Sequence, residues 1–130
     1  MLAKITIADY MTKNIMTIKQ DADALAAIKQ LLSHKITCAP VLDQAGKLVG
    51  MFSEIDCMEV VLSASYNQGM SGKVEDFMST DIVSVNAESS IVDLAEKFKD
   101  TSLRSYPVFD EKALVGIVSR TDVLRALVSI

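Results

Sequence analysis

An internal duplication constrains this chain more than any other feature. An offset of 67 residues places Ile7–Asp43 over Val74–Asp110 and keeps the apolar, polar and proline positions in register. The offset falls to 66 after Gln44–Lys47, which is one residue longer than its counterpart Glu111–Ala113, as expected for a turn. Because each copy has only about 55 residues, a size at which an isolated core is marginal, we expect the copies to bury apolar faces against each other around a pseudo-twofold axis.

Each copy predicts a short strand, a helix, two strands joined by a tight turn, and a final helix. The expected elements are short strands at 16–18 and 83–85, helices capped by Asp23 and Ser90, strand pairs at 40–42 with 47–52 and at 107–109 with 114–118, and final helices beginning near Glu54 and Arg120. The predicted fold class is therefore α/β (α+β), with tandem βαββα repeats at 7–62 and 74–130 and a linker at 63–73.

Composition and charge exclude several functions. Half of the 130 residues are apolar, which fits a compact domain with one core. The net charge of −4 argues against nucleic acid, and the short apolar stretches argue against a membrane span or signal peptide, so we expect a cytoplasmic protein. Cys38, Cys57 and the single histidine, His34, lack metal-ligand spacing. No nucleophile with a matched base is evident, so we expect no catalytic residue, no metal and no obligatory cofactor.

A Gly-x-x-Ser-x-x-Asp motif stands at the start of each final helix, in Gly50–Asp56 and Gly116–Asp122. Two interpretations of its Ser and Asp remain open. They can form a capping box, although such boxes favour Glu or Gln over Asp at the fourth place. Alternatively, the helix N-terminus and the Ser hydroxyl can receive a phosphate, while the carboxylate accepts both hydroxyls of a ribose.

The duplicated motif, together with Pro-Val-Leu-Asp and Pro-Val-Phe-Asp in the middle strands, resembles the cystathionine-β-synthase (CBS) domain family over nearly the whole chain. The resemblance implies a pseudo-twofold CBS-domain pair, also called a Bateman module. It further implies that Asp contacts the ribose and Ser the phosphate of an adenosine ligand, in two clefts built crosswise from both copies.

The residues of the two clefts follow from this resemblance alone. The first cleft would combine Met51, Ser53, Asp56, Ile82, Val83, Arg104, Ser105 and Pro107. The second would combine Ile15, Met16, Thr37, Cys38, Pro40, Ile117, Ser119 and Asp122.

Arg104 makes these clefts unequal, because its counterpart is the uncharged Thr37. A guanidinium can hold phosphate with two hydrogen bonds, so we expect the first cleft to prefer more phosphate, and the second to bind a less charged ligand or remain empty. A solvated strand end is the alternative for Arg104. Arg120 could serve the second cleft, since a cation in the first turn opposes the helix dipole and hints at a nearby anion.

These features predict a regulatory module that binds an adenosine-containing nucleotide and signals through a regulated protein target or its own oligomer. A ligand-free dimerisation or protein-interaction module is the alternative. AMP, ADP, ATP, S-adenosylmethionine and cyclic dinucleotides all remain open as ligands. The final helices are apolar in nearly all directions, so we expect an uncovered face around Cys57, Val60, Val61 and Ala126, and hence a homodimer.

Overall fold

The computed structural model describes residues 4–69 and 72–129, and the chain divides into two compact units. One unit comprises residues 16–82; the other comprises residues 83–130 together with residues 1–15. Each unit has its own hydrophobic cluster, so the expectation of one core is wrong. Two clusters form because each small sheet is covered by its own pair of helices.

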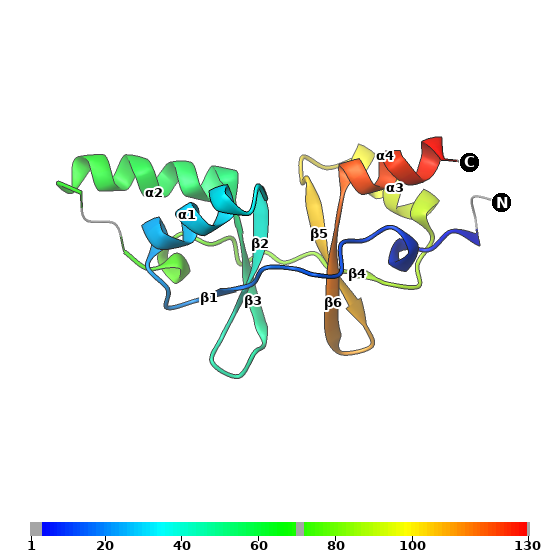
Figure 1. The fold of residues 1–130 in the computed structure, drawn as a ribbon, viewed down its shortest axis with the longest axis horizontal. Coiled ribbons are helices and arrows are strands. Elements are labelled where there is room, and N and C mark those ends of the chain that lie inside the picture. Colours follow the sequence, from blue (N-terminus) through cyan, green and yellow to red (C-terminus); the bar gives the residue numbers. More distant parts are fainter. Residues whose placement is uncertain (1–3, 70–71, 130) are drawn as a thin grey trace. The chain divides into compact units, whose positions relative to one another are not determined.

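The 16–82 unit is a three-stranded sheet with two helices (Figure 1). Its elements are β1 (Ile18–Lys19), α1 (Ala24–Ser33), β2 (Cys38–Leu42), β3 (Leu48–Ser53) and α2 (Glu54–Tyr66). The strand order is β1-β2-β3, with β1 parallel and β3 antiparallel to β2. Leu31 of α1, Val41 of β2 and Phe52 of β3 are buried in one cluster, so the helices and the sheet share a core.

The 83–130 unit repeats this topology with β4 (Val85–Asn86), α3 (Ile91–Lys99), β5 (Ser105–Asp110), β6 (Ala113–Ser119) and α4 (Arg120–Val128) (Figure 1). The pairing of β5 with β6 shifts register between Val108 and Phe109. The pairing of β2 with β3 shifts at the equivalent place, between Val41 and Leu42. The duplication therefore extends to the irregularities of the strands, and the predicted fold class is confirmed.

Several predicted boundaries are wrong, and the middle strands begin two residues earlier than expected, at Cys38 and at Ser105. The first strand of each repeat begins two residues later than expected, at Ile18 and at Val85, because only there does the chain pair with the middle strand. The expected linker 63–73 begins inside α2, which continues to Tyr66 and is capped by a hydrogen bond from the amide of Asn67 to the carbonyl of Ser63. The caps at Asp23 and Ser90 are confirmed.

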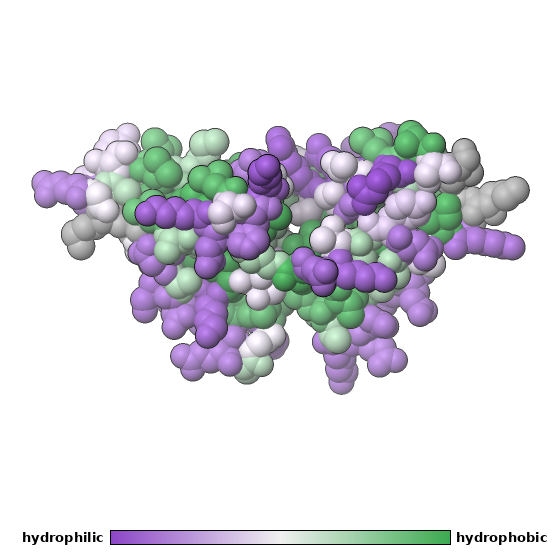
Figure 2. Space-filling model, in the orientation of Figure 1, coloured by the Kyte–Doolittle hydropathy of each residue, from purple (hydrophilic) through white to green (hydrophobic). Residues whose placement is uncertain are grey.

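The uncovered face of the final helices is only partly where the sequence predicted it. Val60 and Ala126 are completely buried, because they lie on the sides of α2 and α4 that meet the clusters, and Cys57 is half-buried. Val61 is exposed as predicted, and the other exposed apolar side chains are Ile55, Met58, Leu62 and Tyr66 on α2, with Leu124 and Val128 on α4. Figure 2 shows apolar surface over both helices. Among the described residues, no helix is long and apolar enough to cross a membrane.

The opening segments of the two repeats are exchanged. The opening segment of the first repeat packs in the 83–130 unit, and that of the second repeat packs in the 16–82 unit. Ile7 is buried in the cluster of the 83–130 unit, and its amide donates to the carbonyl of Ser89 at 2.9 Å. Val74 is buried in the cluster of the 16–82 unit, and its amide donates to the carbonyl of Ala22 at 2.9 Å. The units of packing thus cut across the sequence repeats.

The opening segment of each repeat, which packs in the unit of the other repeat, is called the exchanged segment. It packs closely against a glycine in the last strand of that unit. A Cβ atom on Gly50 would stand 2.6 Å from the Met78 sulfur and 2.9 Å from the Ser79 carbonyl oxygen. A Cβ on Gly116 would stand 2.6 Å from the Thr12 carbonyl oxygen. Beside the first glycine, Met51 and Ser79 exchange two backbone hydrogen bonds of 2.9 Å. Any larger residue would push the exchanged segment away from the strand.

We therefore expect Gly50→Ala and Gly116→Ala each to lower the free energy of unfolding by about 1–3 kcal/mol, the usual cost of overpacking. Gly116→Ala should cost more, because its nearest neighbour is backbone and cannot rotate away. Urea unfolding followed by circular dichroism measures this. Gln44→Ala is the control, since Gln44 lies exposed in the β2–β3 turn. Equal, small effects of all three substitutions would contradict the assigned role of the glycines.

Candidate functional site

The candidate site residues centre on the N-termini of α2 and α4. Ser53 and Ser119 are the N-caps, and both have extended backbone. The amide of Ser53 donates to Oδ2 of Asp56 at 2.9 Å, and that of Ser119 to Oδ2 of Asp122 at 2.8 Å. The capping boxes are therefore present in both repeats, and a ligand would have to use what the boxes leave over.

The residues before each proline meet these helix starts within the same unit. The amide of Glu54 donates to the carbonyl of Thr37, and the amide of Arg120 to the carbonyl of Arg104, both at 3.1 Å. The N-cap serine and the third helical residue also have partners for their amides, in the capping box. Three of the first four amides at each helix start are therefore already hydrogen-bonded. Few amide N–H groups at these helix starts remain free to bind a phosphate. A phosphate would therefore depend more on the Ser hydroxyl and on nearby cations than on the helix amides.

The strand register brings further candidates together in each unit. Cys38 lies opposite Ser53, and Pro40 opposite Met51. In the other unit Ser105 lies opposite Ser119, and Pro107 opposite Ile117. Ile15 and Met16, like Ile82 and Val83, stand where the chain passes from one unit to the other. The 16–82 unit therefore contains the motif expected in the first cleft and the pre-proline segment expected in the second, and the 83–130 unit contains the reverse. The crosswise clefts remain a prediction.

Asp56 has a partner that the sequence reasoning missed. The hydroxyl of Ser79, 23 residues away, donates to Oδ1 and Oδ2 of Asp56 at 3.2 and 3.3 Å. The Ser53 hydroxyl also donates to Oδ2, at 3.0 Å. The duplication holds a weak signal for Ser79, since its counterpart Thr12 is also a hydroxyl residue. Asp56 is half-buried and its partners are neutral.

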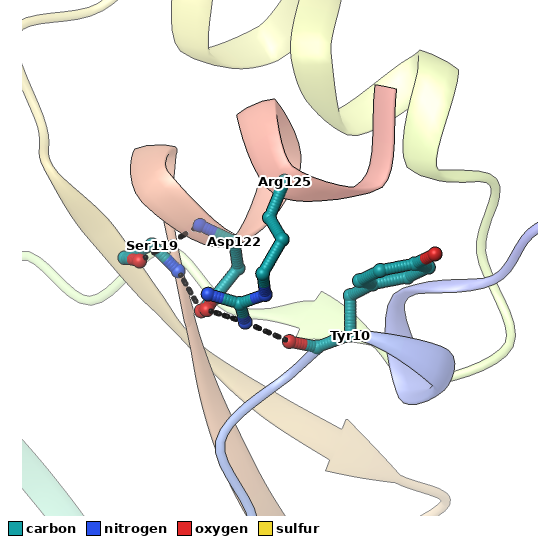
Figure 3. Close-up of polar contacts among 4 residues, drawn as sticks. All are labelled: Tyr10, Ser119, Asp122 and Arg125. Carbon is teal, nitrogen blue, oxygen red and sulfur yellow. Dashed lines mark hydrogen bonds and ion pairs between the residues drawn. The ribbon is translucent and has the colours of Figure 1, made fainter. Parts of the chain in front are cut away.

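Asp122 also has a partner that the sequence reasoning missed, Arg125 (Figure 3). Nη2 of Arg125 lies 2.7 Å from Oδ1 of Asp122, and the same nitrogen donates to the carbonyl of Tyr10 at 3.4 Å. The Asp122 side chain is 8% exposed. The i, i+3 spacing of an acid and an arginine on a predicted helix was the available signal.

Arg120 is engaged within its own unit. Its Nε donates to the carbonyl of Leu103 at 2.9 Å, and its Nη2 to the carbonyl of Thr101 at 3.2 Å. These bonds hold the loop between α3 and β5 against the start of α4. They account for a cation at this helix start without a nearby anion.

Two other features bear on ligands. In the described part of the chain, the Ser105 hydroxyl is buried and has no hydrogen-bond partner. A buried hydroxyl normally has a hydrogen-bond partner, so the Ser105 hydroxyl retains an unused donor and acceptor. Within residues 4–69 and 72–129, no three His, Cys, Asp or Glu side chains gather as metal ligands would.

Known proteins resemble this chain over nearly its whole length. The CBS domain family model matches residues 7–63 and 74–129. The homoserine O-acetyltransferase of Methanococcoides burtonii is 30% identical over 97% of this chain, but the chain spans only 25% of that protein. The CBS domain-containing protein YhcV of Bacillus subtilis is 29% identical, and the match covers 90% of this chain and 81% of YhcV.

Among solved structures, the chain is similar to CBSX2 in complex with AMP, a protein of Arabidopsis thaliana. The identity is 29%, the TM-score is 0.82, and the match covers 95% of this chain and 96% of the other. The CBS domain pair of protein MJ0100 has the same fold, with a TM-score of 0.81 at 24% identity and coverage of 96% and 97%.

Cys57 follows Asp56 on α2 and is poorly suited to be a nucleophile. Burial, reinforced by the charges of Asp56 and Glu54, raises the pKa of the Cys57 thiol from 9.0 to about 11. The reactive form of a cysteine is its thiolate, which is scarce at neutral pH when the pKa is this high. The same shift lowers folding stability as the pH rises from 9.0 towards 11, because the unfolded thiol ionises first.

We therefore expect alkylation of Cys57 by iodoacetamide to be slow at pH 8 and to accelerate about tenfold per pH unit without levelling off near pH 9. Mass spectrometry of the modified peptide separates Cys57 from Cys38. Cys57→Ser is the matched control and should leave only the Cys38 reaction. A rate that levels off at or below pH 9 would contradict the raised pKa.

Proposed function

The chain belongs to the CBS-domain family, and on that premise we propose that it is a regulatory module that senses an adenosine-containing nucleotide. The observation that carries the proposal is the duplicated helix start, where a Ser hydroxyl and an Asp carboxylate are fixed side by side by the capping box. The similar protein CBSX2 binds AMP, which supports an adenosine ligand.

In the proposed first cleft, Asp56 accepts the ribose hydroxyls, for which a carboxylate with neutral hydroxyl partners is well suited. The Ser53 hydroxyl and the Arg104 guanidinium contact phosphate. Met51 contributes apolar surface to the adenine, and so do Ile82, Val83 and Pro107, while Ser105 offers its hydroxyl. Arg104 is exposed, as a phosphate ligand should be, and its backbone is anchored to the start of α4.

In the proposed second cleft, Ser119 and Asp122 take the corresponding roles. Ile117 and Pro40 supply apolar surface together with Ile15, Met16 and Cys38, and the uncharged Thr37 stands where Arg104 stands in the first. The second cleft would therefore bind a less charged ligand or remain empty. AMP, ADP, ATP and S-adenosylmethionine are the candidate ligands, and no catalytic step is assigned to either cleft.

The output of the module goes through a protein surface rather than a reaction. The exposed apolar side chains of α2 include Tyr66, 84% exposed, and Ile55, 78% exposed, and clustered apolar surface of this kind often marks a protein-interaction site. A second copy of the chain would cover them in an isologous homodimer. The same surface also favours the second candidate function, a ligand-free interaction module, or a regulated protein target as partner.

The ligand site is tested with Asp56→Ala. We expect binding of AMP, ATP or S-adenosylmethionine to weaken by about tenfold or more, because the ribose hydroxyls lose their charged acceptor. Isothermal titration calorimetry measures it. Asp76→Ala is the matched control, since Asp76 caps a turn of the same unit by accepting from the Lys73 amide but lies outside the motif. Equal affinity in both variants would remove Asp56 from the site, and no binding by the native chain would favour the ligand-free module.

The dimer is tested with Val61→Glu, which places a charge among the exposed apolar side chains of α2. We expect the native chain to be dimeric at micromolar concentration by light scattering, and the variant to be monomeric, because burying an unpaired carboxylate is costly. Gln44→Glu adds the same charge in the β2–β3 turn and should stay dimeric. A monomeric native chain, or a dimeric Val61→Glu, would contradict this interface.

A further inference from the structure

The two motif carboxylates have different electrostatic partners, although both belong to a capping box. Both oxygens of Asp122 are in use: Oδ2 accepts from the Ser119 amide at 2.8 Å, and Oδ1 is paired with the Arg125 guanidinium at 2.7 Å (Figure 3). Arg125 is itself held by the Tyr10 carbonyl. The exchanged segment 4–12 therefore supports the ion pair, which leaves the Asp122 side chain 8% exposed.

The corresponding position in the other repeat cannot form this pair. Glu59 stands where Arg125 stands, three residues after the motif aspartate, and a carboxylate repels Asp56 rather than pairing with it. The contacts of Asp56 come from the Ser53 amide and from the hydroxyls of Ser53 and Ser79. These hydroxyls are neutral and can rotate, so they can be replaced by the hydroxyls of a ribose.

A ribose diol binds a carboxylate by donating two hydrogen bonds to its oxygens. At Asp56 the ribose hydroxyls would replace the Ser53 and Ser79 hydroxyls, so one set of neutral donors replaces another. At Asp122 it would have to displace a charge-assisted bond to a guanidinium, which is about twice as strong as a neutral one. It would also leave Arg125 without its carboxylate. The difference disfavours a nucleoside at Asp122.

From this asymmetry we infer that Arg125 closes the Asp122 motif to ribose, so that the chain binds one adenosine nucleotide, at Asp56. Arg125 is then a specificity-determining residue that sets how many ligands the module takes. This inference rests on the proposed function and deepens it. It also opposes a different role for Arg125, in which the guanidinium holds the ligand phosphate.

The duplication supplies a matched pair of substitutions. Arg125→Ala removes the guanidinium from Asp122, and Glu59→Arg installs one at the equivalent place beside Asp56. Calorimetry with AMP and with S-adenosylmethionine, which share the ribose diol, gives the number of sites and the affinity. We expect one site in the native chain, two in Arg125→Ala, and an affinity lowered by about tenfold or more in Glu59→Arg. Glu59→Ala removes the native carboxylate without adding a cation, and should keep the native affinity within about threefold.

Several outcomes would overturn the inference. Two equal sites in the native chain would show that Arg125 does not close Asp122, and weaker binding in Arg125→Ala would show that it holds phosphate. An unchanged single site in a folded Arg125→Ala, verified by its thermal unfolding, would also overturn it. Should that variant not fold, Glu59→Arg decides, and native affinity there overturns the inference. No binding by the native chain or any variant would defeat the proposed function itself, and the inference with it.

Discussion

Each unit depends on the close approach of a segment from the other repeat to a glycine of its last strand. Met78 and the Ser79 carbonyl lie against Gly50, and the Thr12 carbonyl lies against Gly116. The same segments bring Val74 and Ile7 into the two clusters. They also place the Ser79 hydroxyl beside Asp56 and the Tyr10 carbonyl beside Arg125. The glycine contact therefore supports the core and the surroundings of the motif at once.

Capping and ligand binding are compatible uses of the same motif. The capping box occupies Oδ2 of each aspartate through the amide of the N-cap serine, which fixes the carboxylate at the helix start. What the other oxygen contacts is decided by residues outside the motif. Ser79 reaches Asp56 from a distant segment, whereas Arg125 reaches Asp122 from the next turn of the helix. One repeated motif thus gives two carboxylates of different chemistry.

Helix α2 connects the proposed ligand site with the proposed output. Its first turn carries Asp56, its inner side buries Val60 and Ala64, and its outer side exposes the apolar residues from Ile55 to Tyr66. A ligand that favours one position of the start of α2 would shift the population of positions of the whole helix. In the proposed function, the exposed side of α2 is the surface on which a partner senses that shift.

The sequence alone determined the duplication, the order of strands and helices, the caps at Asp23 and Ser90, and the motif at each final helix. These features are local, since periodicity, turn residues and capping chemistry act over a few residues. Tertiary structure decided the rest. The copies carry the same apolar pattern, so nothing local shows that Ile7 packs with the second repeat and Val74 with the first. Helix α2 is apolar in nearly every direction, so only packing revealed that Val60 is buried and Ile55 exposed. The i, i+3 spacing along the helix could indicate the pairing of Asp122 with Arg125. Spacing could not indicate the contacts made by the exchanged segments, from Ser79 to Asp56 and from the Tyr10 carbonyl to Arg125, because these depend on proximity in the tertiary structure.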